Sequence, residues 1–333
     1  MKKFRNLLLT LLSVACLATV AVGFAGCQFG MQGSDSFNSS NVEEKESSKG
    51  LEFELTSDGK AYVVVGIGEC QDAELVIPAR YQALPVVSIG DAAFFRCDNL
   101  TSVVIPMGIT SIGMNAFRDC SILSKIVIPD SVESIGYKAF SGCNNMVEMT
   151  LPFLGKSKNE EENAHLGVIF DGHRGVPITL RKVIITSATM IDNHAFAYCS
   201  SLTSVVIPDS VTTIGNHAFA YCSSLTSVVI GDSVTTIGYA AFADCNSLTS
   251  VIIPDSVTTI GDSAFSNCRS LTSVVIPDSV TTIGNLVFYF CDSLTSITFD
   301  GTVAQWNAIS KGTNWNYNVP ATEVVCKDGV VSL

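Results

Sequence analysis

Cysteine is the residue of this sequence with the widest chemical range, because its thiolate can attack carbon, bind a metal ion or form a disulfide. Eight of the twelve cysteines recur every 23 residues within two series: Cys97, Cys120 and Cys143, then Cys199, Cys222, Cys245, Cys268 and Cys291. Such even spacing lacks the clustered C-x-x-C pairs that are typical of zinc sites. Copies one repeat apart would lie close enough for a disulfide, but their parallel side chains would be poorly oriented. We predict buried, small apolar cysteines, with disulfides and metal binding as the open alternatives.

Histidine is the second residue type that could do chemistry, and the chain has four. His194 and His217 occupy the same place in consecutive repeats and are expected to lie side by side on the surface. His165 and His173 fall in an irregular segment, residues 152–180. This segment also holds several charged residues: Glu160, Glu161, Glu162, Asp171 and Arg174. Two histidines without a third ligand make a weak metal site. We predict surface histidines and no bound metal, with a two-histidine site as the alternative for either pair.

No catalytic motif accompanies these residues in the sequence. The chain has no phosphate-binding glycine loop, no H-E-x-x-H helix and no G-x-S-x-G elbow. No set of nucleophile, base and orienting acid stands out either. We predict that the protein is not an enzyme, has no catalytic residues and needs no cofactor.

The 23-residue period indicates a solenoid in which each repeat forms one coil. In one repeat, Val205 and Ile207 alternate with Ser204 and Val206, as in a β-strand with one buried face. Pro208 cannot donate a ladder hydrogen bond, so it is expected to end this strand before a turn.

The rest of the repeat predicts a second strand and a bend. Residues 211–214 are β-branched and suit a short strand on another side of the coil. Gly215 permits a bend, after which Asn216 is placed to cap one turn of helix. Stacked coils would bury the apolar positions as continuous columns. One column is phenylalanine and is predicted to be a core spine: Phe94, Phe117, Phe140, Phe196, Phe219, Phe242, Phe265 and Phe288.

The repeat pattern L-x-x-V-x-I-P-x-x-V-x-x-I-G-x-x-A-F-x-x-C resembles the BspA-like class of leucine-rich repeats, found in bacterial and protist surface proteins. The resemblance covers the chain from about Leu51 to the C-terminus. It implies a right-handed leucine-rich-repeat solenoid with dominant parallel strands, short second strands and short helical turns. It also implies interaction at the cell surface, since relatives have been linked to host matrix proteins and to co-aggregation.

Both ends of the solenoid are expected to carry caps that cover the strand edges of the terminal coils. The first cap is predicted as a hairpin, because residues 51–68 alternate around Asp58-Gly59. The predicted organisation is a hairpin cap at 51–68, repeats at 69–151, an irregular insertion at 152–180, repeats at 181–299 and a C-terminal cap at 300–333. Loops that leave a solenoid tend to carry function, so the insertion is the least repetitive candidate surface.

Residues 1–27 are expected to act as a lipoprotein signal peptide. A basic start precedes an apolar run, residues 7–22, that is short for a bilayer. Phe24-Ala25-Gly26-Cys27 resembles a bacterial lipobox, which implies a diacylglyceryl group on Cys27 at the mature N-terminus. Cleavage without lipidation is the alternative, because Phe24 stands where the motif usually has Leu. Residues 28–50 are polar and predicted to be a flexible tether.

The charge of the chain limits its partners. The net charge is −12, and removal of residues 1–27 takes away three positive charges to leave −15. A chain this acidic is not expected to bind nucleic acid or anionic lipid. The predicted membrane contact is therefore the N-terminal lipid.

The outward face of the main strand is the predicted partner-binding surface. It presents two columns taken from successive repeats: Ser204, Val206, Ser227, Val229, Ser250, Ile252, Ser273 and Val275. A mildly apolar strip of this length on a secreted protein indicates that a partner binds to it or that another part of the protein covers it. We predict a lipid-anchored bacterial cell-surface protein that binds an extracellular protein or glycan in adhesion. The alternatives are a structural spacer or envelope scaffold, and an accessory subunit of a surface enzyme or transporter that uses residues 152–180.

Overall fold

The computed structural model describes residues 46–157 and 164–333. The chain divides into two compact units, Met1–Glu46 and Ser47–Leu333, and nearly all of the first unit lies outside the described residues. The predicted signal peptide, Cys27 and most of the predicted tether therefore lie outside them too.

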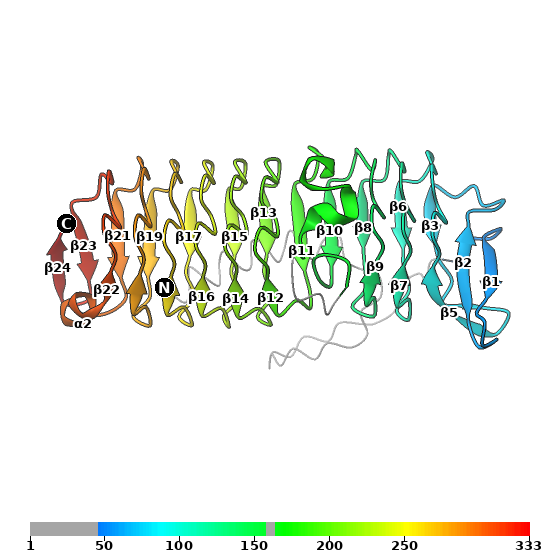
Figure 1. Ribbon diagram of the computed structural model, residues 1–333, viewed down its shortest axis with the longest axis horizontal. Coiled ribbons are helices and arrows are strands. Elements are labelled where there is room, and N and C mark those ends of the chain that lie inside the picture. Colours follow the sequence, from blue (N-terminus) through cyan, green and yellow to red (C-terminus); the bar gives the residue numbers. More distant parts are fainter. Residues whose placement is uncertain (1–45, 158–163) are drawn as a thin grey trace, which may run out of the picture. The chain divides into compact units, whose positions relative to one another are not determined.

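The second unit is a parallel β-solenoid of about 11 turns with very little helix (Figure 1). This confirms the solenoid predicted from the 23-residue period and the leucine-rich-repeat fold that the resemblance implies. The first strand of each coil joins the main side of the solenoid: β3 (Glu74–Val76), β6 (Ser102–Val104), β8 (Lys125–Val127), β10 (Glu148–Leu151), β11 (Lys182–Ile185), β13 (Ser204–Val206), β15 (Ser227–Val229), β17 (Ser250–Ile252), β19 (Ser273–Ile276), β21 (Ser296–Phe299) and β23 (Glu323–Cys326). Strands β3 to β15 form one sheet and β17 to β23 belong to another, with β15 and β17 as neighbours.

A second side is formed by two-residue strands, apart from the six-residue β5 (Leu84–Ile89). Its first sheet contains β5, β7 (Ser111–Ile112) and β9 (Ser134–Ile135). Its second sheet contains β12 (Met190–Ile191), β14 (Thr213–Ile214), β16 (Thr236–Ile237), β18 (Thr259–Ile260), β20 (Thr282–Ile283) and β22 (Ser310–Lys311). All of these strands pair in parallel with the equivalent strand of the next coil within their sheet.

An antiparallel hairpin lies at each end of the stack (Figure 1). At the first end, β1 (Glu52–Leu55) pairs with β2 (Tyr62–Gly66), which then pairs in parallel with β5, while β4 (Arg80–Tyr81) folds back on β5. At the other end, β24 (Gly329–Ser332) pairs with β23. Helix α2 (Val303–Ala308) precedes them and begins with a capping box between Thr302 and Gln305.

The strand pattern read from the repeat is confirmed. In β13 the side chain of Val205 is buried, while Ser204 and Val206 on either side are half-buried. The strand ends before Pro208, whose carbonyl accepts a hydrogen bond from the Val211 amide at 3.1 Å to close the turn. The pattern therefore leaves one strand face available to solvent and turns the other into the core.

The third side of each coil is a series of turns, and the helical turn predicted after Asn216 is wrong. The amides of His217, Phe219 and Tyr221 donate to carbonyls of the next coil at 2.7–2.9 Å, which occupies the donors that a helix would need. His217 and Tyr221 also have positive φ values of 54° and 62°, which interrupt a right-handed helix.

Asn216 and Gly215 serve contacts between coils. The side-chain oxygen of Asn216 accepts from the Tyr239 amide at 2.8 Å, one coil further on, and caps no helix. Gly215 was expected to permit a bend, but its φ lies outside the left-handed region. The close approach of the neighbouring coil is what excludes a side chain at this position. A Cβ at Gly215 would lie 2.7 Å from the Asn193 nitrogen, and one at Gly238 would lie 2.8 Å from the Gly215 carbonyl carbon. Glycine is therefore needed here so that neighbouring backbones can approach.

The phenylalanine column is buried and stacked, as predicted. Phe196, Phe219 and Phe242 are 0% exposed, and their ring centroids lie 5.0 Å apart in nearly parallel planes. The column ends at Trp315, which meets Phe288 edge-on at 6.2 Å and packs beside the buried Trp306 of α2.

The irregular segment is one enlarged coil of the solenoid. Glu148 of β10 pairs directly with Lys182 of β11, so 34 residues separate equivalent positions where Lys125 and Glu148 are 23 apart. On the turn side, the 3-10 helix η1 (Leu166–Phe170) takes the place of the usual turns, and a second one, η2 (His173–Gly175), follows it. The Phe140 amide donates to the Ile169 carbonyl at 2.9 Å, and the Leu166 amide donates to Ala195 of the following coil.

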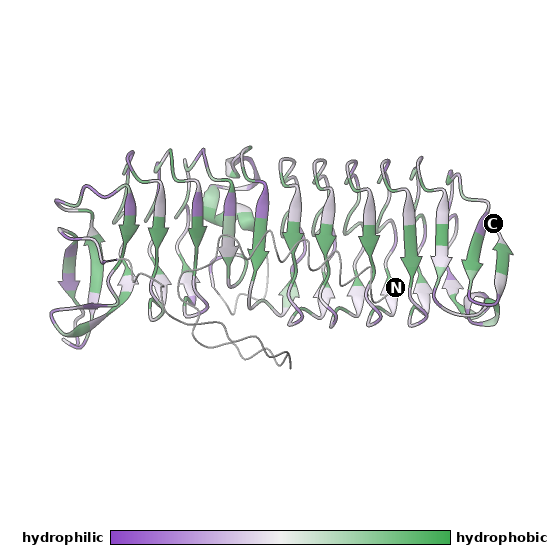
Figure 2. Ribbon diagram, turned by 180° about the vertical axis from the view of Figure 1, so that it is seen from behind, coloured by the Kyte–Doolittle hydropathy of each residue, from purple (hydrophilic) through white to green (hydrophobic). Residues whose placement is uncertain are grey.

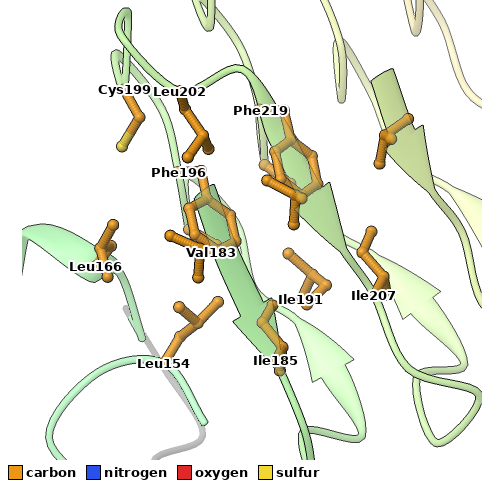
Figure 3. Packing of buried hydrophobic residues seen from close by; sticks show 14 of the residues in the cluster. Leu154, Leu166, Val183, Ile185, Ile191, Phe196, Cys199, Leu202, Ile207 and Phe219 are labelled. Carbon is orange, nitrogen blue, oxygen red and sulfur yellow. The ribbon is translucent and has the colours of Figure 1, made fainter. Parts of the chain in front are cut away.

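The enlarged coil contributes to the core. All five residues of η1 are buried, and Phe170 meets Phe140 at 6.2 Å. Figure 3 shows Leu154 and Leu166 of this segment in the same core as Ile185 and Phe196. The segment is thus built into the stack.

The last residues of the predicted tether lie against the first coil. The Ser48 amide donates to the Val76 carbonyl at 2.9 Å, and the Ser48 hydroxyl accepts from the Val76 amide at 3.0 Å. The Gly50 carbonyl accepts from Glu69. The described structure therefore begins its packing a few residues before the predicted boundary at residue 51.

We predict that Gly238→Ala lowers the free energy of unfolding by about 1–3 kcal/mol, because the new methyl group would push two coil backbones apart. Denaturant unfolding of the full chain measures the change. Gly329→Ala is the matched control, since it alters the unfolded chain in the same way but places its Cβ no nearer than 3.4 Å to Val303. Equal stability of the two variants would contradict the spacing constraint.

Candidate functional site

The structure places the predicted strand-face residues in two regular columns. Ser204 pairs in register with Ser227, Val206 with Val229, Ser250 with Ser273, and Ile252 with Val275. Ile252 is 40% exposed and the valines are half-buried. This face is therefore a flat lattice of hydroxyl and branched apolar side chains.

The face is uncharged from β13 to β21, with charged side chains on both sides of that stretch, at Glu323 of β23 and in the N-terminal coils. Glu148 accepts ion pairs from Lys125 at 3.4 Å and from Lys182 at 3.7 Å, so opposite charges alternate along three coils. Figure 2 shows the starts of these strands as hydrophilic, whereas the serine-bearing starts of the C-terminal strands are pale. Lys182 was missed in the sequence, although it precedes Val183, where the period resumes.

Most thiols of the cysteine column are difficult to ionise, whereas a hydrogen bond with Cys120 lowers the pKa of Cys97. All ten cysteines in the described part of the chain are buried and free of disulfides. Their thiols donate to the carbonyl of the phenylalanine 26 residues earlier, at 3.0–3.2 Å, in six coils: Cys120, Cys143, Cys222, Cys245, Cys268 and Cys291. Burial raises the pKa of the Cys199 thiol to about 12. A thiol held protonated is a poor nucleophile and a poor metal ligand.

All four histidines of the chain gather beside the enlarged coil. His194 and His217 stack with ring centroids 4.9 Å apart and planes 8° from parallel, which confirms that they lie side by side. His165 and His173 form a second stack at 4.5 Å. The sequence did not indicate that the two pairs are neighbours, because the fold of residues 152–180 decides it.

Tyrosine rings extend the histidine group. Tyr198 meets His173 at 6.2 Å and stacks on Tyr221 at 4.9 Å with planes 2° apart. Tyr239 lies 4.9 Å from His217 at an interplanar angle of 81°. We call Asn193, His194, Tyr198, Asn216, His217, Tyr221 and Tyr239 the turn-side aromatic surface.

Burial holds two of the histidines in the neutral form. Desolvation lowers the pKa of His173 below its ordinary value. A hydrogen bond with the Ala197 backbone raises this pKa in part, and nearby His194 lowers it. The pKa of His217 is lowered by burial first and by His194 second. The Nδ1 atom of His173 is buried without a hydrogen-bond partner, which also disfavours a second proton there.

A hollow of about 600 Å³ lies on the other side of the enlarged coil. Its lining includes Ser141, Phe170, Asp171, Arg174 and Ile178. Asp171 is held by the Lys138 ammonium at 3.0 Å, and that contact lowers the pKa of its carboxyl group.

In the part of the chain that the structure describes, the residues that could do chemistry form no recognisable metal centre. Within residues 46–157 and 164–333, no group of three or more His, Cys, Asp or Glu side chains is arranged to hold a metal ion. The same part of the chain has no helix of the length and apolarity that a membrane span requires.

Comparison with known proteins gives the family. The BspA-type leucine-rich repeat region matches residues 77–162 and 189–310 with six copies, which is more than half of the chain. The chain belongs to the BspA-type leucine-rich repeat family. The matched residues include the coils that carry the strand face and the turn-side aromatic surface. No curated protein was found to match the chain.

Solved bacterial structures are similar to this BspA-type chain. A leucine-rich cell surface protein from Faecalibacterium prausnitzii is 24% identical, covers 80% of this chain and 97% of its own, and has a TM-score of 0.38. A leucine-rich repeat protein from Bacteroides ovatus is 28% identical, with 84% and 70% coverage and a TM-score of 0.44. A leucine-rich repeat protein from T. pallidum is 24% identical, with 68% and 91% coverage and a TM-score of 0.40. BspA-type homologues are bacterial cell-surface proteins, and such solenoids are typically non-enzymatic.

We predict that lowering the pH from 7.5 to 5 lowers the melting temperature, partly through His173 and His217. Both have folded pKa values below the ordinary 6.5, so the unfolded chain takes up protons more readily. Stability present above about pH 6.5 is therefore lost as the pH falls through the window beneath it. The double variant His173→Gln/His217→Gln should show a smaller fall by scanning calorimetry. An unchanged pH dependence in that variant would contradict the assignment.

Proposed function

We propose that this BspA-type protein is displayed on the bacterial cell surface by a lipid on Cys27 and binds an extracellular protein or glycan in adhesion. The observation that carries the proposal is the solenoid itself, which offers a long, regular strand face. Family membership suggests a protein-binding repeat scaffold.

The strand face from β13 to β21 is the proposed contact surface. Its side chains are uncharged, so they lose less hydration on binding than the ion pairs around Glu148 would. In-register stacking repeats the same Ser and Val chemistry from coil to coil, which favours many weak contacts along one partner.

We predict that Val206→Glu/Val229→Glu/Ile252→Glu weakens partner binding at least about tenfold, because three charges would enter an uncharged contact surface. The measurement is binding of the full chain to an immobilised panel of extracellular matrix proteins. The control is Thr212→Glu/Thr235→Glu/Thr258→Glu, which adds the same charge at exposed positions of the second side.

Binding lost equally in both triple variants would point to net charge and not to the strand face. Binding kept by the strand-face variant would remove that face from the proposal. Unchanged circular dichroism and melting temperature must accompany either result.

The lipid anchor rests on the lipobox-like sequence at Cys27, which lies outside the described residues. A diacylglyceryl group supplies two acyl chains, which is enough for stable attachment. We predict that intact mass of the membrane-extracted chain shows an N-terminal Cys27 with a diacylglyceryl group, and that Cys27→Ala moves the protein to the soluble fraction. An unmodified chain released by wild-type cells would overturn the anchor and leave the binding face untouched.

A further inference from the structure

Two adjacent coils carry the same nine residues on their turn side. Residues 193–201 and 216–224 both read Asn-His-Ala-Phe-Ala-Tyr-Cys-Ser-Ser, whereas the next three coils read differently at these positions: YAAFADCNS, DSAFSNCRS and NLVFYFCDS. The main strand keeps a nearly constant text over the same coils. Turn-side chemistry therefore varies along the stack, and this pair of coils presents one set of groups twice.

The duplicated side chains form two parallel rows. The histidine row has centroids 4.9 Å apart, and the tyrosine row Tyr198–Tyr221 has the same 4.9 Å spacing. Stacking covers the inner ring faces, so a ligand meets the ring edges and the phenol hydroxyls. Tyr239 is turned 81° from the plane of His217 and stands half-exposed at one end of the rows.

These side chains are accessible and polar. Tyr198, Tyr221 and Tyr239 are 59%, 47% and 48% exposed, and His194 is exposed. The exposed side chains of the two identical segments are Asn, His, Tyr and Ser, without an exposed aliphatic, carboxylate, ammonium or guanidinium group. Aromatic side chains with polar edges bind through both ring contact and hydrogen bonds.

We propose that the turn-side aromatic surface is a binding site for a neutral, extended β-1,4-linked glycan. The inference takes surface display from the proposed function, but it does not depend on the strand face. Asparagine amides, imidazole nitrogens and phenol hydroxyls hydrogen-bond to sugar hydroxyls, and the Tyr239 ring contacts the apolar face of a pyranose.

The repeat of the site favours a repeating ligand. Equivalent groups on adjacent coils stand about 5 Å apart, and an extended β-1,4-linked chain advances by a closely similar length per sugar. Successive sugars therefore fall in step with successive coils, and because alternate sugars are turned over, the two coils together match one disaccharide unit. Tyrosine is also common at protein contact surfaces, so the spacing of the repeated groups is the observation that favours a glycan.

The test is isothermal titration calorimetry of the full chain with cellohexaose, with maltohexaose as the linkage control. Wild-type protein is expected to bind cellohexaose and to bind maltohexaose at least about tenfold more weakly. The variant Tyr198→Ala/Tyr221→Ala/His194→Ala should lose at least about tenfold in cellohexaose affinity. Tyr289→Ala/Tyr317→Ala removes a similar stacked, turn-side tyrosine pair, 5.6 Å apart near the C-terminus, and should bind as wild type does.

Four outcomes would overturn the inference. They are no binding of cellohexaose by wild type, equal binding of the two hexaoses, unchanged affinity in the triple variant, and equal loss in the Tyr289/Tyr317 control. Loss of binding on addition of a chelator would assign the surface to a metal ion instead. The Val206→Glu/Val229→Glu/Ile252→Glu variant should keep cellohexaose binding, so failure of the glycan site and failure of the strand face are distinguished.

Discussion

The parallel hydrogen-bonded ladder between coils is the constraint on which the rest of this structure depends. It fixes neighbouring backbones about 4.8 Å apart, so each side chain must stack on its own copy in the next coil. Flat phenylalanine rings satisfy this spacing in the core, with centroids 5.0–5.7 Å apart from Phe196 to Phe288. Glycine meets the same spacing where a Cβ would collide with the preceding coil. Cysteine is small enough to fit between coils, where its thiol donates a hydrogen bond to a phenylalanine carbonyl.

The same constraint explains which features could be predicted from sequence. Alternation around Val205, the turn at Pro208 and the phenylalanine spine follow directly from a repeat of fixed length, and each is present. The helical turn after Asn216 was wrong because its amides donate to the next coil, and a single repeat read by itself contains no neighbour. Helix propensity is a property of the sequence within one coil, whereas these hydrogen bonds form between two coils.

Residues 152–180 mark the limit of period-based reasoning. Their sequence does not repeat, so neither the direct pairing of β10 with β11 nor the substitution of η1 for a turn could be read from it. The meeting of the two histidine pairs depends on that substitution and was missed for the same reason. The position of Lys182 on the strand face could have been predicted, because it directly precedes Val183, where the repeat pattern resumes. The strand-face residues were placed correctly in columns, since they depend only on the period.

The two sides of the stack change sheet at different levels. On the main side the sheets meet between β15 and β17, where β16 and β18 on the second side are paired. On the second side they meet at the enlarged coil, where β10 and β11 on the main side are paired. Under a pulling force applied along the stack, a row of paired backbone hydrogen bonds on one side would lie opposite each sheet boundary on the other side. Because the two sheet boundaries fall at different coils, no single level of the solenoid, within the residues that the structure describes, lacks strand pairing on both sides.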